Sequence, residues 1–412
     1  MLPDGWRLTT LGDIGSVKSG STPARSQHDR YFVGGKWPWV KTMDLTNSEI
    51  LTTDEVITDA ALAESSCRLF PAGTVLVAMY GGFKQIGRTG LLREKSAVNQ
   101  AISAIDIERN QADPEFVLHW LNGSVETWRN YAASSRKDPN ITRENVCDFP
   151  VILPTLGEQR RIAHILSTWD QAIATTERLL ANACTQRKTL TNALFVHGRH
   201  SSMTTHGWKF ADLDEVFERV TRRNTTANSN VLTISGTRGL VSQRDYFNKS
   251  VASENLSGYT LIERGEFAYN KSYSAGYPMG AIKPLTRYDQ GVVSSLYICF
   301  RLRDGVEADA DFFRHYFEVG MLNEGLSGIA QEGARNHGLL NVGVGDFFKL
   351  RLHIPDVTEQ RRVAAILNMA EQKEQLITAQ LDKLRDEKKA LMSQLLTGKR
   401  RVRLPADEAA HA

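Results

Sequence analysis

The sequence predicts an α+β protein built as a tandem repeat, in which each of two globular domains is followed by a long helix. Two observations support this fold class. A segment that opens at Pro154 occurs again from Pro355, and both copies continue into Glu-Gln-Arg-Arg, an aliphatic residue and alanine. The start of each half is also repeated, since Gly5-Trp6-Arg7 matches Gly207-Trp208-Lys209. Self-similarity over most of the chain indicates two copies of one structural unit.

Both copies of the repeated segment have the pattern of a long helix with one narrow apolar face. Apolar residues recur every three to four positions, as in a coiled coil. Each segment follows a proline and runs to a glycine, which are common helix boundaries. At 1.5 Å per residue, about 40 residues would form a rod of roughly 60 Å. The predicted seam residues are Ile162, Leu166, Trp169, Ile173, Leu180, Leu190 and Leu194, and then Val363, Leu367, Ile377, Leu381, Leu384, Leu391 and Leu395.

A narrow apolar face must be buried, and the other copy of the helix is the obvious partner. Tandem copies tend to pack as an isologous dimer does, so we expect an antiparallel coiled coil with pseudo-two-fold symmetry. Two seam positions, Arg187 and Glu374, carry opposite charges. We expect these side chains to face each other and to fix the register of the two helices.

The repeat also predicts the domain boundaries. We expect globular domains at 1–153 and 201–353, long helices at 154–200 and 354–404, and a disordered tail at 405–412.

Each globular domain is expected to contain a buried strand that runs into a glycine-containing loop. A second, alternating strand follows that loop in both domains. The first strand covers 73–79 or 265–270, and the second covers 97–107 or 291–302.

A helix is expected after these strands in each domain, capped by Asp113 in the first and by Asp311 in the second. The first of these helices should end near Ala133. His119 and His315 occupy repeat-equivalent positions beside apolar residues, so we expect them to be buried in the core rather than to form a site.

Composition leaves the class of partner open. A net charge of +3 over 412 residues neither announces nor excludes nucleic-acid binding. The four cysteines show no CxxC spacing, which predicts reduced thiols in a cytoplasmic protein. No apolar run approaches 18 residues, so no membrane span is expected.

The sequence contains no catalytic motif that we would defend. It lacks a GxxxxGK[ST] phosphate loop, a GxSxG elbow, an HExxH helix and a glycine-rich turn suited to S-adenosylmethionine. Two similar domains on a rod would instead read one ligand twice, in opposite orientations. Duplex DNA suits this arrangement because its half-sites are related by a dyad.

Candidate DNA-contacting residues lie in the glycine loops and in the later polar loops of both domains. Arg, Lys, Asn and Gln are the side chains that make bidentate hydrogen bonds with base edges. A solvated loop surface is an equally good interpretation of any single residue. The candidates are Lys84, Gln85, Arg88, Arg136 and Lys137 in the first domain, and Asn270, Lys271, Ser272, Tyr273, Arg335 and Asn336 in the second.

With these motifs in view, the chain resembles the specificity subunit of bacterial type I restriction–modification systems. The resemblance rests on the two Pro-x-x-x-Glu-Gln-Arg-Arg helix openings, the two Gly-Trp-basic domain openings and the order of domain, helix, domain, helix. It covers essentially the whole chain.

The resemblance implies that each globular domain is a target recognition domain that reads one half of a split, asymmetric DNA sequence. The long helices would set the gap and dock two methyltransferase subunits, and two restriction subunits would add translocation and cleavage. S-adenosylmethionine, ATP and Mg would then bind in those partners, and this chain would hold no cofactor, metal or catalytic residue.

Three alternatives remain open at this point. The chain could be a stand-alone DNA-binding or regulatory protein, an enzyme with an unrecognised site, or a scaffold for other proteins. A scaffold would show no salt-dependent DNA binding, whereas a protein that contacts phosphates weakens steeply as salt rises.

Overall fold

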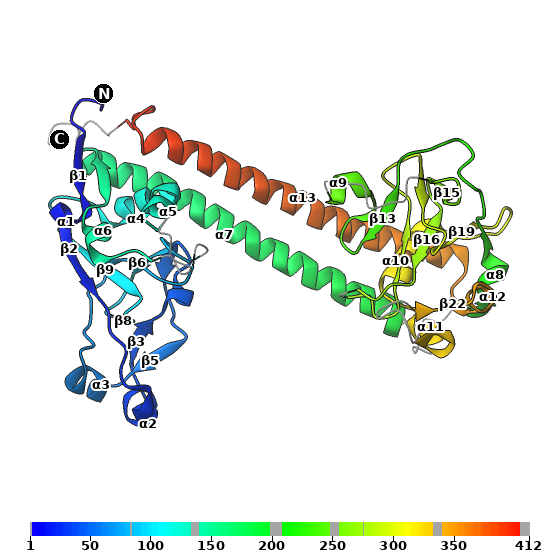
Figure 1. Cartoon of the computed structure of the whole chain (residues 1–412), viewed down its shortest axis with the longest axis horizontal. Coiled ribbons are helices and arrows are strands. Elements are labelled where there is room, and N and C mark those ends of the chain that lie inside the picture. The colour runs from blue at the N-terminus through cyan, green and yellow to red at the C-terminus, as the bar shows by residue number, and fades with distance from the viewer. Residues whose placement is uncertain are drawn as a thin grey trace. The chain divides into compact units, whose positions relative to one another are not determined.

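The computed structural model describes residues 2–82, 85–132, 140–197, 208–247, 255–274, 276–332 and 340–403. The chain forms two compact units (Figure 1). Unit 1 comprises Met1–Glu177 with Ala379–Ala412, and unit 2 comprises Arg178–Thr378. Each unit therefore combines one globular domain with parts of both long helices.

The globular domain of unit 1 is built on a five-stranded mixed sheet. Its strand order is β2 (Gly15–Ser19), β9 (Ile102–Ile107), β6 (Val75–Ala78), β7 (Thr89–Leu92) and β4 (Ser48–Ile50). Neighbouring strands are antiparallel except for β7 and β4. A second sheet has the order β5 (Glu55–Ile57), β3 (Trp37–Val40) and β8 (Ala97–Val98).

The globular domain of unit 2 repeats the central part of this topology. Its four-stranded antiparallel sheet has the order β12 (Phe217–Arg219), β19 (Ile298–Leu302), β16 (Phe267–Asn270) and β17 (Ala281–Pro284). This is the order β2-β9-β6-β7 of unit 1. The described residues of this unit also form three further two-stranded antiparallel pairs outside the closing pair, namely β13 (Leu232–Ser235) with β14 (Gly239–Ser242), β15 (Thr260–Glu263) with β18 (Gln290–Val293), and β20 (Gln331–Glu332) with β21 (Leu340–Asn341).

Two strands predicted as continuous are in fact interrupted. The stretch 97–107 divides into β8 and β9 because the Asn99 side chain accepts a hydrogen bond from the Ala101 N–H (3.2 Å) and forms a turn. The stretch 291–302 divides into β18 and β19 at Ser294, whose carbonyl accepts from the Tyr297 N–H (3.0 Å). Polar side chains that bond their own backbone favour such turns.

A short antiparallel pair closes each globular domain by joining its first and last strands. In unit 1 it pairs β1 (Arg7–Thr10) with β10 (Pro150–Leu153), and in unit 2 it pairs β11 (Lys209–Asp212) with β22 (Arg351–Ile354). The short helices are α1 (Leu11–Ile14), α2 (His28–Tyr31), α3 (Asp59–Glu64), α6 (Arg143–Cys147), α8 (Leu213–Val216), α9 (Gln243–Phe247), α11 (Asn323–Ile329) and α12 (Val344–Phe348), with 3₁₀ turns at Arg25–Gln27 and Thr42–Asp44.

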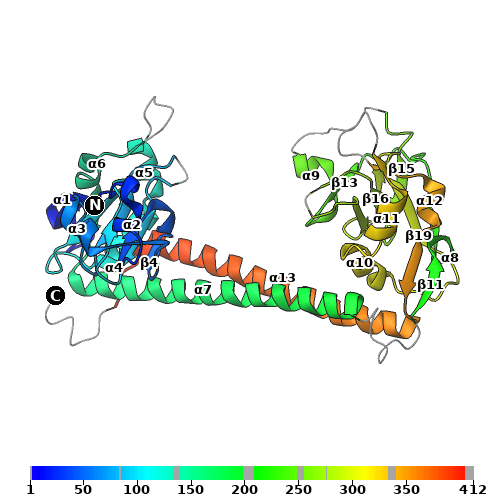
Figure 2. The same ribbon diagram turned by 90° about the horizontal axis from the view of Figure 1, so that it is seen from below.

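The domain helices α4 (Pro114–Gly123) and α10 (Ala310–Glu318) pack between the central sheet and the long helices of their own unit (Figure 2). Asp113 caps α4 as predicted, because its side chain accepts from the Phe116 N–H at 3.0 Å. The cap of α10 is Asp309, which accepts from Phe312 N–H at 2.8 Å. The prediction of Asp311 as the cap was wrong, because that residue already lies inside the helix.

The helix predicted to run from 113 to about 133 is two helices, α4 and α5 (Val125–Ala132). Ser124 separates them. Its hydroxyl donates to the Trp120 carbonyl (2.8 Å) and its N–H donates to the Leu121 carbonyl (3.1 Å). These bonds close the end of α4 and leave α5 free to start in a new direction.

The two long helices are α7 (Leu156–Asn192), which ends in a π turn at Ala193–His197, and α13 (Val357–Leu395). Polar pairs between them show an antiparallel arrangement in unit 1, because Glu177 lies further along α7 than Asp170 while its partner Arg385 lies earlier in α13 than Lys388. In unit 1 these pairs are Asp170 with Lys388 and Glu177 with Arg385, and in unit 2 they are Gln186 with Lys373 and Arg187 with Glu374.

The predicted pairing of Arg187 with Glu374 is confirmed, with 2.8 Å between Nε and Oε1. The Glu374 carboxylate raises the pKa of Arg187, and most of the Glu374 side chain is shielded from water. That this pair fixes the register stays a prediction.

Almost all of the predicted seam residues lie on the buried or half-buried face of their helix. Leu166 and Leu367 are fully buried. Leu190 is the exception, with 39% of its surface exposed. One turn from Glu374, α13 carries the small Ala370. The next residue, Glu371, forms an ion pair with Arg314 of α10, with 2.8 Å between Oε2 and Nη1. Little apolar surface is therefore available to cover Leu190.

The glutamine of each Glu-Gln-Arg-Arg motif ties the start of a long helix to its globular domain. The Gln159 side chain accepts from the Asp113 N–H (2.9 Å) and donates to the Pro154 carbonyl (2.9 Å). Gln360 makes the same two bonds, to Asp309 (3.0 Å) and Pro355 (2.9 Å). Both glutamines are 2% exposed or less. We call this pair of bonds the glutamine clamp.

The far end of each long helix lies in a hydrophobic core. In unit 2, Phe195 is fully buried against Phe312 and Tyr316 of α10. In unit 1, Leu395 and Leu396 are buried in the core that also contains Ile162 and Leu166. Phe195 and Leu396 are repeat-equivalent, so each core is completed by the end of one long helix and the start of the other.

His119 and His315 are buried, as predicted. The Nε2 atom of His119 lies 3.2 Å from Ser167 Oγ, and that of His315 lies 2.8 Å from Asn368 Oδ1. Ser167 and Asn368 are themselves repeat-equivalent. Burial lowers the pKa of His119 to about 4, although the nearby Asp170 carboxylate acts in the opposite direction.

The four cysteines are free thiols. Across the described ranges, no helix has the length and apolarity that crossing a bilayer would require.

The glutamine clamp generates a stability prediction. Gln159→Ala leaves the Asp113 N–H and the Pro154 carbonyl without their partner, so we expect the free energy of unfolding to fall by about 1–3 kcal/mol. Gln360→Ala should have the same effect through unit 2. Urea unfolding measures the change, with Gln171→Ala, an exposed glutamine on α7, as the control. Equal stability of the Gln159→Ala and Gln171→Ala variants would contradict the role of the clamp.

The buried His119 generates a pH prediction. Between about pH 4 and the ordinary value near 6.5, the unfolded chain binds a proton at this histidine and the folded chain does not. Stability is therefore lost as the pH falls through this window. Comparison of His119→Gln with the wild type by denaturant unfolding at pH 7 and pH 5 should show a smaller pH effect in the variant.

Candidate nucleic-acid interface

The predicted DNA-contacting residues within the described ranges lie on two repeat-equivalent loops. Gln85 and Arg88 lie between β6 and β7, and Asn270, Lys271, Ser272 and Tyr273 lie at the end of β16 and on the way to β17. Both loops leave the third strand of the shared four-strand order. The candidates Lys84, Arg136, Lys137, Arg335 and Asn336 lie outside the described residues.

The loop of unit 1 is fixed by a close backbone approach. Gly87 has φ of +74°, and a Cβ placed there would stand 2.7 Å from the Trp128 ring. Trp128 is fully buried and stacks on Phe149, with 3.8 Å between the ring centroids. A side chain at position 87 would therefore have to displace a core aromatic residue.

Polar contacts hold the two ends of this loop. The Gln85 side-chain amide donates to the Met43 sulfur (3.1 Å), and the Gln85 carbonyl accepts from Arg88 N–H (2.9 Å). Just beyond Arg88, the carbonyl of the buried Thr89 accepts from the Asn47 N–H (2.9 Å), and the Thr89 N–H donates to Asn47 Oδ1 (3.0 Å). Asn47 has φ of +62°. Asn122 of α4 accepts from the Thr89 hydroxyl (2.5 Å). The loop is thus presented at a defined place at the end of the sheet.

In the loop of unit 2, the predicted residues divide into two roles. The Asn270 Oδ1 atom accepts from the Ser272 N–H at 3.1 Å, so this amide oxygen shapes the turn. The Lys271 carbonyl accepts from Leu340 N–H (2.9 Å). Tyr273, in contrast, is 64% exposed and presents its ring to solvent. The geometry therefore favours Tyr273 over Asn270 as a contact to a ligand.

A buried lysine anchors the same loop. The Lys283 ammonium donates to the Tyr277 hydroxyl (2.8 Å) and pairs with Glu318 of α10, and the Tyr277 hydroxyl lies 2.7 Å from the Glu318 carboxylate. Burial is the first cause of a raised pKa at Tyr277, and the Glu318 carboxylate adds to it. Lys283 lies on the strand that follows the loop, but Glu318 comes 35 residues later in the sequence, so no local pattern could have predicted this anchor.

The sequence analysis also missed Tyr80. It lies two residues after β6, at nearly the same place as Tyr273 after β16, and is 45% exposed. An exposed tyrosine beside a glycine-rich loop was the available signal. Aromatic rings with a polar tip are well suited to contact groove edges and sugars.

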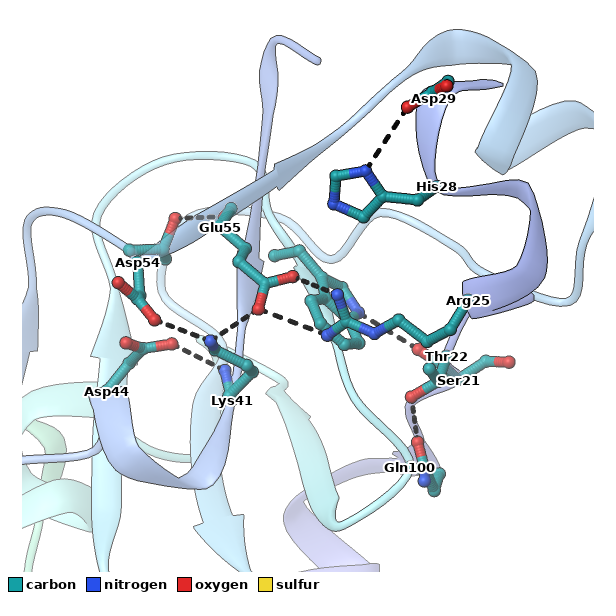
Figure 3. A network of polar contacts seen from close by, with 12 residues as sticks. Ser21, Thr22, Arg25, His28, Asp29, Lys41, Asp44, Asp54, Glu55 and Gln100 are labelled. Atoms are coloured by element: carbon teal, nitrogen blue, oxygen red, sulfur yellow. Dashed lines mark hydrogen bonds and ion pairs between the residues drawn. The ribbon is translucent and has the colours of Figure 1, made fainter. Parts of the chain in front are cut away.

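In the layer of unit 1 that carries β3 and β5, Arg25 and Lys41 are both paired with carboxylates (Figure 3). Arg25 forms a two-bond pair with Glu55 (2.6 and 3.2 Å), and Lys41 bonds both Glu55 (2.8 Å) and Asp54 (2.7 Å). The Arg25 guanidinium is the main reason why the pKa of Glu55 falls to about 2. These charges stabilise the layer that carries β3 and β5 and leave little positive charge for a ligand.

Comparisons with known proteins agree with this construction. Residues 3–183 match the family described as the type I restriction modification DNA specificity domain. The Type I restriction enzyme MjaIX specificity subunit of Methanocaldococcus jannaschii is 27% identical over 176 residues, which are 42% of this chain and 39% of that protein. The matched region thus spans about two fifths of the length of this curated relative.

The fold is similar to that of solved type I subunits over nearly the whole chain. The S subunit of the type I restriction–modification system from M. genitalium superposes with a TM-score of 0.57 and 15% identity, covering 96% of this chain and 97% of that one. A chain from a study of complex assembly and conformational transition of the type I system gives a TM-score of 0.57 with 18% identity, covering 97% and 99%.

The fold is therefore that of the S subunits of type I restriction–modification systems. The resemblance to these specificity subunits that the repeated motifs indicated is confirmed, and the match to the DNA specificity domain covers the first globular domain and most of α7.

The exposed Tyr273 generates a binding prediction. Tyr273→Ala should reduce discrimination at one or two base pairs, at about 1–3 kcal/mol per base pair. Competition binding over a library of duplexes measures this preference. Val306→Ala is the control, because Val306 is also exposed but follows β19 at the opposite end of the sheet. A Tyr273→Ala preference profile identical to that of Val306→Ala would count against a reading role.

Proposed function

We propose that this chain is the DNA sequence-recognition subunit of a type I restriction–modification complex. Each globular domain reads one half of a split, asymmetric target in double-stranded DNA. The observation that carries the proposal is the repeat-equivalent placement of two exposed loops, each on a domain tied to a long helix by the same glutamine clamp. The two loops differ in every contact described above, so the two half-sites should differ as well.

The long helices set the spacing of the half-sites in this proposal. Helix α7 has 37 residues and is therefore roughly 55 Å long. A stiff element of this length gives a fixed gap, whereas a flexible linker would tolerate several gap lengths.

The chain itself is proposed to be non-catalytic and to act in the cytoplasm. Two methyltransferase subunits would bring S-adenosylmethionine and methylate adenine, and two restriction subunits would bring ATP and Mg for translocation and cleavage. The solved neighbour whose study concerns complex assembly of the type I system supports an assembly of this kind.

A map of adenine methylation in cells tests the proposal. Deletion of the gene, with its neighbours intact, should abolish methylation of one split motif with a fixed gap. Gln85→Ala should alter only one half of that motif, and Tyr273→Ala only the other half. An unchanged map after deletion, together with no sequence preference of the purified chain for DNA, would refute the proposal.

A further inference from the structure

A cleft in unit 1 gathers three cations and no carboxylate. It has a volume of about 370 Å³ and is lined by Val17, Lys18, Ser19, Gly20, Ser21, Ser66, Arg68 and Arg143. Lys18, Arg68 and Arg143 are all exposed. Among the described residues, no carboxylate lies within ion-pair distance of these three side chains.

This lack of partners sets the cleft apart from the rest of the unit. Arg25, Arg30, Lys36, Lys41 and Arg93 each pair with at least one carboxylate. One of the other cavities of this unit, beside Arg93 and Arg109, is lined by Asp113 and Glu115 as well. Only at the Lys18 cleft, among these places, is positive charge left for something outside the chain to neutralise.

The cleft lies at the same end of the sheet as the Gln85 loop. Ser19 at the end of β2 pairs with Ser103 near the start of β9, and Ile102 pairs with Ala78 at the end of β6, where the loop begins. A duplex in contact with the loop would therefore pass close to the cleft. The distance across two antiparallel strand spacings is roughly 10 Å, which is less than the width of the major groove.

The cleft is also preformed. A Cβ at Gly20 would stand 2.2 Å from the Val98 carbonyl, so the backbone of β2 and β8 approaches closely beneath it. The Arg143 Nε donates to the Val17 carbonyl at 3.0 Å, which orients its guanidinium at the rim. Ser21 and Ser66 hydroxyls bond each other at 2.6 Å across the cleft. A preorganised cationic site of this kind suits a phosphate group, whose oxygens accept charge-assisted bonds.

We propose that Lys18, Arg68 and Arg143 hold a backbone phosphate of the target duplex and so position the Gln85 loop over its half-site. This inference rests on the proposed DNA-recognition function. In the matching stretch after β12 of unit 2, Arg222 is instead paired with Glu263 (3.3 Å) and Glu266. The proposed phosphate contact is therefore assigned to the half-site that unit 1 reads.

Lys18→Gln and Arg68→Gln, made separately in the full chain, test the proposal. Each should raise the Kd about threefold or more for target and non-target duplexes alike, because phosphate contacts carry no base information. The slope of log binding constant against log salt should become shallower by about 1. Fluorescence anisotropy over a salt series measures both quantities.

Lys95→Gln is the matched control, since Lys95 is an exposed lysine in the turn after β7, at the opposite end of the sheet. It should leave the Kd and the salt slope near wild-type values. If Lys18→Gln and Arg68→Gln behave like Lys95→Gln, the phosphate contact is refuted. Thermal unfolding checks that all three variants are folded.

Two further results separate the possible failures. Calorimetry with inorganic phosphate at constant ionic strength should show no strong site. The proposal would be overturned if phosphate bound, if Lys18→Gln abolished that binding, and if the salt slope for DNA stayed unchanged. The cleft would then serve a small phosphorylated ligand instead. A wild-type chain without any sequence preference would refute the proposed function, whatever the variants do.

Discussion

The glutamine clamp is the interaction on which the rest of each unit depends. A buried amide has two donors and an acceptor. Each clamp uses one of each, to bond the N-cap of the domain helix and the proline that directly follows the last strand. The long helix, α4 or α10 and the closing strand pair therefore share one fixed junction. Because an unpaired amide would be costly in this buried place, the junction has one favourable geometry. The position of the loop after β6 or β16 is fixed in turn, because the domain helix packs on the sheet that carries this loop.

The same scaffold carries two differently built loops. In unit 1 the loop is held by the close approach of Gly87 to Trp128 and by the Asn47–Thr89–Asn122 contacts. In unit 2 the corresponding loop is anchored by a lysine, a tyrosine and a glutamate that have no counterpart in unit 1. Conserving the junction while changing the loop is the arrangement expected where binding preference varies on a constant framework.

Periodic and repeated features could be predicted from the sequence, and features set by tertiary contact could not. The seam of α7 and α13 and the Arg187–Glu374 pair follow from heptad spacing and antiparallel packing, which are local rules applied twice. Asp311 was chosen as a cap because it too is an aspartate at the start of the helical pattern. Asp309 is the true counterpart of Asp113, since each accepts from the N–H of the phenylalanine three positions later. The Lys283 anchor and the Lys18 cleft join segments distant in sequence, so no spacing reveals them.

The order in which the segments of the two units follow along the chain has a consequence for synthesis on the ribosome. Unit 2 consists of one continuous segment, Arg178–Thr378, whereas unit 1 needs Ala379–Ala412 as well as the first 177 residues. The core of unit 1 contains Leu395 and Leu396, which are made only after the whole of unit 2. Unit 1 is thus begun before unit 2 and completed after it, and its apolar helix surface stays uncovered while unit 2 is made. Nascent chains are expected to need protection from aggregation during that interval.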